Sequence, residues 1–211
     1  MSVTVITLAG MSVTVIRYDR RMVRWEGDSR GRLEQAALAL YGERGFDNTT
    51  VAEIAERAGL TKSTLFRHFT DKQEVLFWGQ DALIRLFVDA ITGAPGSATP
   101  IDAVVAALDS AATVFRSERR AWAQQRQAVI AGNSDLRERE LLKRATLAEA
   151  MADALRKRGV TDPTASLAAE FGSLAFRNAF VRWADPANQR DFADVAHQEL
   201  DGLRAAAAAL D

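Results

Sequence analysis

A glycine between two short amphipathic segments is the feature that most constrains how this chain can fold. Gly59 follows "TVAEIAERA" and precedes "LTKSTLFRHF". Thr50 and Glu53 have the spacing of a capping box, so a helix should begin at Val51. A glycine permits the positive φ that ends such a helix and turns the chain sharply. Thr61 can then cap a second short helix. The sequence therefore predicts a helix-turn-helix outline over residues 50–69.

The second short helix should have two different faces. Leu65 and Phe69 lie one turn apart and can anchor it inward. No acidic residue occurs between Glu56 and Asp71, and a carboxylate there would repel the phosphates of a nucleic acid. Arg and Lys can reach guanine edges or phosphates in a duplex groove, and hydroxyl groups can donate to phosphate oxygens. An ordinary helical hairpin with exposed cations is the alternative. The outward side chains are Lys62, Ser63, Thr64, Phe66, Arg67 and His68, with Lys72 beside them.

The rest of the chain is predicted to be helical, which makes the protein all-α with about nine helices. A helix from Ser29 ends near Gly45, and a fourth helix should open at Asp71 and run to about residue 92. "TGAPGSATP" then marks a connector. Apolar spacing predicts further helices at about 101–117, 118–131, 135–158, 163–184 and 188–210.

The first residues repeat themselves, because "MSVTVI" recurs at a ten-residue offset. We expect residues 1–26 to form a flexible, partly basic arm, and residues 17–32 resemble a basic segment that tracks a phosphate backbone. A strand-forming arm is the alternative, since Val, Thr and Ile favour extended backbone. The working start codon can be Met1, Met11 or Met22.

Composition excludes several classes of site. The chain has no cysteine and only two histidines, so we expect no disulfide, no metal site and no cofactor. No GxSxG, GxGxxG, P-loop or HExxH motif occurs, so we do not expect an enzyme. No apolar run reaches membrane-spanning length, and the N-terminus lacks the basic region of a signal peptide. We therefore predict a cytoplasmic protein without a membrane partner.

"TTVAEIAERAGLTKSTLFRHFTDKQEVL" resembles the DNA-binding region of the TetR family of transcriptional regulators. The resemblance is specific across about residues 27–87, and beyond them it rests on length and helical layout. It implies a homodimer with a three-helix DNA-binding head, a fourth helix that links the head to the body, and a helical body over residues 88–211 that binds a small effector.

The resemblance also implies site residues in the head. Lys62, Ser63 and Thr64 lie where this family reads bases, and Thr50, His68 and Lys72 lie where it grips phosphate. Phe66 departs from the family pattern, which has tyrosine there, and its ring cannot donate to a phosphate. Arg67 can compensate for that loss. The DNA-contacting set is Thr50, Thr61, Lys62, Ser63, Thr64, Phe66, Arg67, His68 and Lys72.

Two sets of residues in the second half of the chain are candidates for binding. Aromatic and polar side chains could surround an effector, although core packing is the alternative. The last two long helices could form a dimer surface, although packing within one chain is the alternative. The effector candidates are Trp78, Phe87, Phe115, Trp122, Gln125, Arg126, Phe176 and Arg177. The dimer candidates are Leu174, Phe180, Val181, Val195, Leu200 and Leu203.

The predicted function is sequence-specific regulation of transcription. A twofold dimer would place two reading helices about 34–36 Å apart, so the operator should be an inverted repeat. An effector bound in the body would tilt the fourth helix and release the operator, which makes the protein a repressor, with activation as an alternative. A helical small-molecule-binding or protein-interaction module without DNA binding is the competing hypothesis, favoured by Phe66 and by the net charge of −1. The sequence identifies neither the effector nor the operator.

Overall fold

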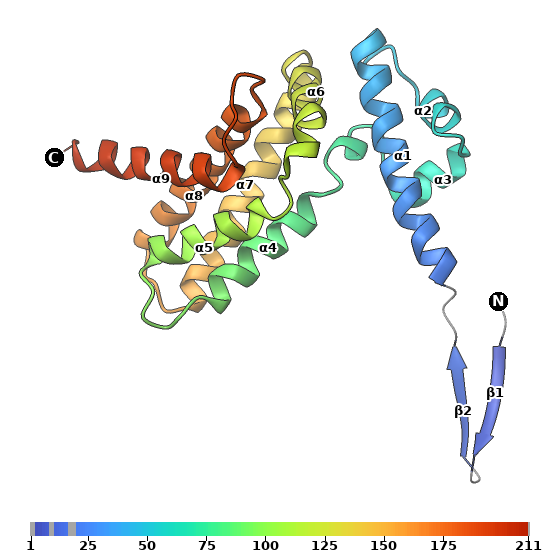
Figure 1. Ribbon diagram of the computed structural model, residues 1–211, viewed down its shortest axis with the longest axis horizontal. Helices are drawn as coiled ribbons and strands as arrows, with labels where there is room; N and C mark the ends of the chain where they lie inside the picture. Colours follow the sequence, from blue (N-terminus) through green and yellow to red (C-terminus); the bar gives the residue numbers. More distant parts are fainter. Residues whose placement is uncertain (1–2, 9–10, 17–19, 211) are drawn as a thin grey trace.

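The computed structural model of the chain describes residues 3–8, 11–16 and 20–210, with side chains described for residues 29–210. In this part the chain forms nine α-helices, two short 3₁₀ helices and one pair of strands (Figure 1). The prediction of an all-α protein is therefore confirmed for everything that follows the strands. The elements are β1 Val3–Leu8, β2 Met11–Ile16, α1 Arg20–Arg44, α2 Val51–Arg57, α3 Lys62–His68, η1 Glu74–Leu76, α4 Gln80–Gly93, α5 Pro100–Ala112, η2 Ser117–Arg119, α6 Arg120–Ala131, α7 Ser134–Lys157, α8 Thr164–Ala184 and α9 Phe192–Ala208.

The two copies of the N-terminal repeat pair with each other. β1 and β2 form an antiparallel hairpin in which Val3 lies opposite Ile16 and Leu8 lies opposite Met11. The repeated Val and Thr residues favour extended backbone. These two segments are therefore strands, as the alternative prediction had it, and do not form an unstructured tail.

Helix α1 begins earlier than predicted. It runs from Arg20, whereas the sequence pattern suggested a start at Ser29. The flexible basic arm predicted for residues 17–32 is therefore wrong from Arg20 onward, and residues 17–19 lie outside the described part. Arg, Met and Glu have good helix propensity, and no proline interrupts the segment, so nothing stops the helix from extending toward the N-terminus.

The head consists of α1, α2 and α3 around one apolar cluster. Leu33, Ile54 and Leu65 are fully buried in it, and Phe69 is 4% exposed. Thr50 caps α2 in a full capping box, because its hydroxyl accepts from the backbone of Glu53 and the Glu53 carboxylate accepts from the backbone of Thr50. The hydroxyl of Thr61 accepts from the backbone N–H of Thr64 at 3.1 Å and caps α3. The two short helices thus start where the sequence predicted.

The turn between α2 and α3 depends on Gly59. Its φ is +63°, in the left-handed region that side chains rarely adopt. Arg32 of α1 reaches across the head and donates to the carbonyls of Ala58 and Gly59. The conformation of Gly59 therefore permits the turn, and the hydrogen bonds from Arg32 stabilise it.

Gly59→Ala should destabilise the head by about 1–2 kcal/mol, because an L-residue in the left-handed region costs that much. A Cβ there would also lie 2.7 Å from Nη2 of Arg32, so this guanidinium would have to move. Urea denaturation of the two proteins measures the difference. Gly96→Ala is the control, since Gly96 has no positive φ and no atom within 4 Å of the added Cβ. Equal stability of the Gly59 variant and the parent would contradict the requirement for glycine in the turn between α2 and α3.

The fourth helix differs from the prediction. Asp71 Oδ1 accepts from the backbone of Gln73 and Glu74, as a cap should, but only the 3₁₀ helix η1 follows, and α4 begins at Gln80. Three consecutive residues, 75–77, are buried. Phe77, which follows η1, has φ −117° and ψ +3°, so the backbone leaves the helical conformation there. The chain therefore bends between η1 and α4.

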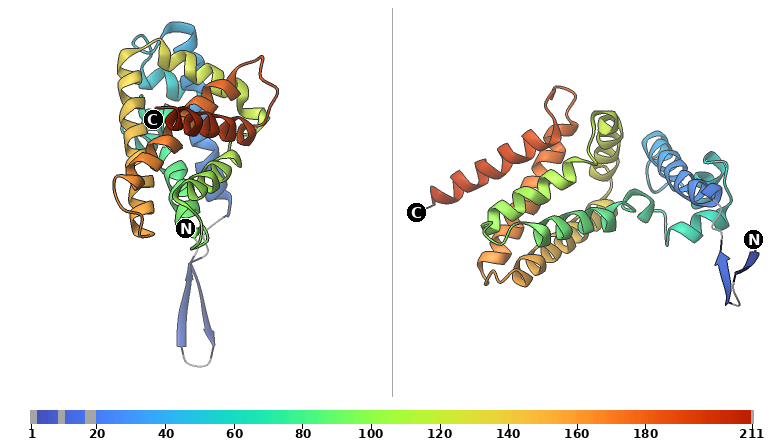
Figure 2. Two further views of the ribbon diagram at one scale, coloured as in Figure 1. Left: turned by 90° about the vertical axis from the view of Figure 1, so that its left-hand side faces the viewer. Right: turned by 60° about the horizontal axis from the view of Figure 1, so that its bottom comes forward.

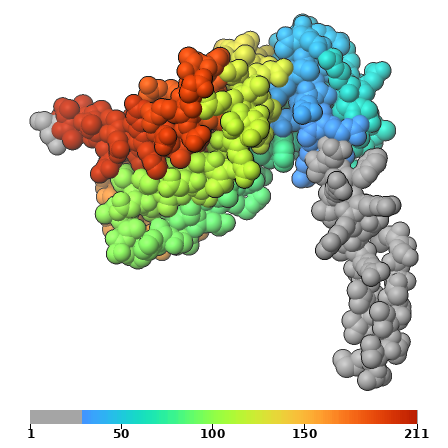
Figure 3. Space-filling view, viewed as in Figure 1, coloured from blue at the N-terminus to red at the C-terminus, as the bar shows by residue number. Residues whose placement is uncertain are grey.

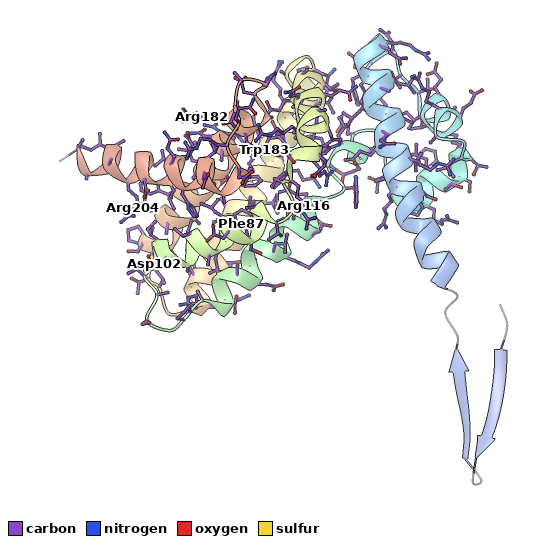
Figure 4. The ribbon with its side chains drawn as sticks, viewed as in Figure 1. Phe87, Asp102, Arg116, Arg182, Trp183 and Arg204 are labelled. Carbon is purple, nitrogen blue, oxygen red and sulfur yellow. The ribbon has the colours of Figure 1, made fainter. Side chains whose placement is uncertain are left out.

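The body consists of α4 to α9, whose arrangement Figure 2 shows. These helices pack around a second apolar cluster. Phe87 of α4 and Trp183 of α8 lie inside it (Figure 4). α5, α7 and α8 approach closely at Gly172, where a Cβ would meet Met151 Cε at 2.5 Å and Val104 Cγ1 at 2.7 Å. Since Phe87 packs in the body, the proposed boundary between residues 87 and 88 falls inside α4.

Head and body meet along α6, α7 and η1. Ile130 and Leu136 of the body complete the apolar cluster of the head. In the space-filling view, the α6 segment lies against α1 (Figure 3). Glu74 of η1 accepts from Arg139 Nε at 2.8 Å and pairs with Lys143 Nζ at 3.3 Å, both on α7. The segment that links the two parts is thus bonded directly to the body.

Candidate functional site

Helix α3 presents a basic, acid-free flank to solvent. Thr61, Lys62, Ser63 and Arg67 are exposed, and Thr64 and His68 are partly exposed. The opposite side is fixed because Leu65 has no exposed surface and Phe69 is almost fully buried. The predicted anchoring of this helix is confirmed. The flank therefore has the charge and the accessibility that a duplex groove requires.

Phe66 lies on the same flank and is 48% exposed. Lys62 Nζ lies 5.7 Å from the centroid of its ring. The ring has no donor for a phosphate, so Phe66 can contribute only apolar contact, for example with a thymine methyl group. Lys62 and Arg67 remain as the charged groups of the flank.

Lys72 does not face solvent as a phosphate clamp would. Its Nζ donates to the carbonyls of Phe46 at 2.8 Å and Thr49 at 2.9 Å, and it lies 4.1 Å from the centroid of the Phe46 ring. These carbonyls belong to the loop between α1 and α2. The sequence pattern did not predict that this loop lies next to Lys72. We therefore assign Lys72 to holding this loop.

Thr50 is likewise engaged inside the head. Its hydroxyl donates to Glu53 Oε2 at 2.8 Å, so the proton that was expected to meet a phosphate already has an acceptor. The same carboxylate pairs with Arg44 at 2.7 Å, and the hydrogen bond from Thr50 helps keep the pKa of Glu53 below its ordinary value. Thr50 acts in this structure as a helix cap.

Lys72→Met should lower the free energy of unfolding by about 1.5–3 kcal/mol, because two hydrogen bonds from a charged donor are lost. Lys62→Met is the matched comparison in the same head, and it should leave stability unchanged while it weakens DNA binding. Urea denaturation and titration with duplex DNA separate the two effects. A Lys72 variant with full stability and a weakened, salt-dependent affinity for DNA would restore the phosphate clamp.

A cavity of about 270 Å³ lies in the body, next to the head. Its wall comes from the η1–α4 segment, from α6, α7 and α8, and from Glu34 of α1. Six of the eight effector candidates line it: Trp78, Phe115, Trp122, Arg126, Phe176 and Arg177. The size and the mainly apolar wall are close to the range of small-molecule sites.

Two effector candidates do not line the cavity. Phe87 has no exposed surface and packs edge-to-face behind Phe176, with ring centroids 5.4 Å apart. Gln125 points toward α1, where its amide lies 3.5 Å from the carbonyl of Leu38. Both belong to packing between elements, because the rotation of α4 and α6 turns them away from the cavity.

Arg126 lines the cavity but is already engaged. Its Nε donates to the carbonyl of Leu76 at 3.1 Å, and its Nη1 pairs with Glu140 at 3.1 Å. The guanidinium also lies 5.0 Å from the centroid of the Phe77 ring. Burial lowers the pKa of Arg126, opposed by the charge of Glu140. A bidentate contact between Arg126 and an anionic ligand is therefore not available without breaking these bonds.

Glu34 is a lining residue that sequence reasoning missed. It is 7% exposed and lies in the buried stripe of α1 with Leu38 and Tyr41. An acid at such a position was the signal that could have found it. Burial raises the pKa of its carboxyl above the ordinary value, against the charge of Arg119, whose Nη2 lies 3.9 Å away.

Glu34→Gln should become more stable relative to the parent as pH rises. The folded-state pKa of Glu34 lies above the unfolded value, so the parent loses stability as pH rises through the folded-state pKa, and the variant lacks this loss. Urea denaturation of both proteins at about pH 4 and about pH 7 measures it. Glu138→Gln, an exposed acid on α7, is the control. A stability difference that stays constant between the two pH values would show that Glu34 titrates normally.

Four of the six dimer candidates are buried within the chain or line its cavity. Val195 and Leu200 are buried in the core of the body, and Phe180 lines the cavity. α8 and α9 pack against each other, which explains this burial. The assignment of Val195 and Leu200 to a dimer surface is therefore wrong, whereas that of Phe180 stays a prediction. Val181 also lines the cavity but is 53% exposed, whereas Leu174 and Leu203 are partly buried.

Two further findings concern the described part of the chain. No helix in it is both long and apolar enough to cross a membrane. Its His, Asp and Glu side chains form no group of three or more that could hold a metal ion.

Comparisons with known proteins match the head. Residues 34–77 match the family "Bacterial regulatory proteins, tetR family". The HTH-type transcriptional repressor KstR2 of Mycobacterium tuberculosis is 42% identical over 60 residues, which are 28% of this chain and 28% of that protein. The regulator TcmR of Streptomyces glaucescens is 34% identical over 76 residues, 36% of this chain and 34% of TcmR. The chain thus aligns with about a third or less of the length of these relatives.

Solved structures match over most of the chain. A putative TetR-family regulator from Syntrophomonas wolfei covers 86% of this chain and 96% of its own, with a TM-score of 0.57 and 17% identity. A complex of SmeT with triclosan covers 84% of this chain and 90% of its own, with a TM-score of 0.56 and 22% identity. SmeT is described as the repressor of a multidrug efflux pump of Stenotrophomonas maltophilia. At these identities the likeness over the whole chain shows the fold alone, and the resemblance to the TetR family in sequence is shown for residues 34–77 of the head.

Proposed function

We propose that this protein is a sequence-specific DNA-binding transcriptional regulator, a repressor whose hold on its operator is released by a small molecule. The observation that carries the proposal is the α3 flank, which is basic, free of acids and exposed while Leu65 and Phe69 hold its other side. Such a helix can enter a major groove and contact base edges and phosphates. Lys62, Ser63, Thr64 and Arg67 are the proposed contacts, with Thr61 and His68 at the edges.

We also propose that the protein binds DNA as a homodimer. A twofold dimer presents two copies of α3 to successive major grooves, about 34–36 Å apart. Val181, Leu174 and Leu203 retain enough exposure to contribute to its surface. The operator should then be an inverted repeat.

The effector would act through the wall that the cavity shares with the head. Glu34 belongs to α1, and residues 76–78 join α3 to α4. A ligand that displaces Arg119 or Trp78 would change how α1 and η1 sit on the body. It shifts the equilibrium only by its difference in affinity for the operator-binding and released forms. The structure supports a hinge between η1 and α4 rather than the tilt of one long helix. Triclosan binding by SmeT is consistent with a small-molecule cavity in this fold.

Selection of bound fragments from random duplex DNA tests the proposal. We expect an enriched inverted repeat whose affinity falls steeply with salt, because phosphate contacts release counterions. Enrichment of no sequence, together with no retention on heparin at low salt, would favour the helical module without DNA binding. Enrichment of a single half-site would retain the DNA contacts and contradict the homodimer.

A further inference from the structure

We infer that the cavity takes an amphipathic carboxylate, a ligand with an apolar ring or chain and one terminal carboxylate, which is held by Arg144 and Arg177. The inference rests on the proposed function, because it names the chemical class of the effector for the same cavity. Arg177 is one of the effector candidates predicted from the sequence, whereas Arg144 is added by the structure, which places both in the cavity wall.

The charges of the cavity do not cancel. Among the residues whose side chains are described, five cations and two carboxylates line it. Arg126 pairs with Glu140 at 3.1 Å and Arg119 lies 3.9 Å from Glu34. Lys143 pairs with Glu74 of η1 at 3.3 Å. The two cations that remain without an ion pair in the described structure are Arg144 and Arg177.

Arg144 also has a donor without an acceptor. Its Nε is buried, and no hydrogen-bond partner lies within reach in the described structure. A guanidinium stays protonated and can only donate, so a buried Nε–H without an acceptor is unfavourable until a ligand supplies one. Gln127, which also lines the cavity, has a buried amide nitrogen without a partner. A ligand oxygen would satisfy donors that the protein leaves unpaired.

Arg177 supplies a second guanidinium from the neighbouring helix. Its Nη2 donates to the neutral amide of Asn178 at 3.1 Å, so its charge is not compensated there. Arg144 on α7 and Arg177 on α8 line both the cavity and an adjoining surface groove. Glu170 lines this groove as well but forms no ion pair with either arginine in the described structure. The two guanidinium groups therefore stand where the cavity meets the groove, and they fit the fork of a carboxylate.

The remaining wall suits an apolar body. It consists mainly of aliphatic and aromatic side chains, and the rings of Phe115, Phe176 and Phe180 lie within 5.4–6.4 Å of one another. An apolar group placed there leaves water without losing hydrogen bonds. A ligand whose carboxylate lies at the groove and whose apolar tail lies among these rings matches both the charged and the apolar end of the cavity.

A cationic ligand fits less well, although Glu34 is a buried carboxylate. Glu34 already faces Arg119 at 3.9 Å. The guanidinium of Arg119 lies 4.3 Å from the centroid of the Trp122 ring and occupies the aromatic face that a ligand cation would use. The position for a cation is therefore filled by the protein itself.

Calorimetric titration of the full chain, without DNA, with matched probes tests the inference. The probes are naphthylacetate, naphthylacetamide and naphthylethylamine, with decanoate, decanamide and decylamine as a second series. We expect a carboxylate to bind roughly tenfold to a hundredfold more tightly than its amide, the ratio that corresponds to a charged hydrogen bond. Equal binding of acid and amide, tighter binding of the amine, or binding of no probe in either series would overturn the inference.

Two variants test whether Arg144 and Arg177 bind the carboxylate of the ligand. Arg144→Met and Arg177→Met should each lower the affinity for the carboxylate toward that of the amide, while binding of the amide is kept and shows that the cavity is intact. Arg85→Met, an exposed arginine on α4 outside the cavity wall, should change neither. Carboxylate binding that survives both substitutions would place the anion elsewhere and contradict the assignment.

The outcome is separable from that of the proposed function. DNA selection that succeeds while the carboxylates fail to bind leaves the regulator and removes this ligand class. Carboxylate binding in a protein that enriches no DNA leaves the ligand class and removes the regulator.

Discussion

Lys62→Glu should weaken binding to the selected operator by roughly 100-fold or more. A phosphate or base contact from one lysine contributes about 1–3 kcal/mol, and the new carboxylate adds repulsion from the nearby phosphates. Lys62 is exposed at the first position of α3 and makes no hydrogen bond or ion pair in the described structure. The substitution should therefore leave the free energy of unfolding within about 0.5 kcal/mol of the parent.

Titration of a labelled operator at several salt concentrations measures this effect. The variant should also show a shallower dependence of affinity on salt, by about one counterion, because a phosphate contact has been removed. Lys157→Glu at the end of α7 is the charge-matched control and should bind as the parent does. Loss of affinity in both variants to the same degree would indicate an effect of net charge rather than a contact by α3.

Trp183→Ala should destabilise the body by about 3–5 kcal/mol, the range observed when a large aromatic core residue is truncated. Trp183 is 1% exposed, and its ring centroid lies 5.9 Å from those of both Phe115 and Phe192, in edge-to-face arrangements. The guanidinium of Arg120 lies 5.5 Å from it. The substitution thus opens a cavity and removes several ring contacts at once.

Urea denaturation followed by circular dichroism measures the loss. Leu142→Ala on α7 is the control, because Leu142 is 58% exposed and should change stability by no more than about 0.5 kcal/mol. Since Phe115 also lines the cavity, the Trp183 variant should bind the carboxylate probes more weakly. A variant with parental stability would mean that the aromatic cluster contributes little to the fold.

Prediction from the sequence succeeded where the signals are local. The caps of α2 and α3 act over three residues, and the positive φ of Gly59 is a property of one residue. The anchors Leu65 and Phe69 follow from the helical period. The basic flank of α3 follows from the same period, so the candidate DNA interface was largely predictable.

Prediction failed where one side chain serves two distant parts of the chain. Lys72 donates hydrogen bonds to carbonyls 23 and 26 residues earlier in the chain. The helical spacing around Lys72 therefore could not predict these partners. Val195 and Leu200 have the same apolar character whether they pack within one chain or between two, and only the position of α9 against α8 decided. The bend before α4 likewise accompanies the burial of Val75, Leu76 and Phe77 in the apolar cluster of the head.

The amino-acid sequence by itself determined the helical class, the helix-turn-helix and the outward face of α3, because caps, turns and periodicity act within a few residues. Only the tertiary structure decided which charges are left unpaired. Arg126 and Arg144 are alike in sequence terms, yet Arg126 pairs with Glu140, whereas Arg144 pairs with no carboxylate among the described residues. The difference arises because the packing of helices that are distant in sequence determines which charged side chains meet. The spacing of residues within one helix does not predict that packing.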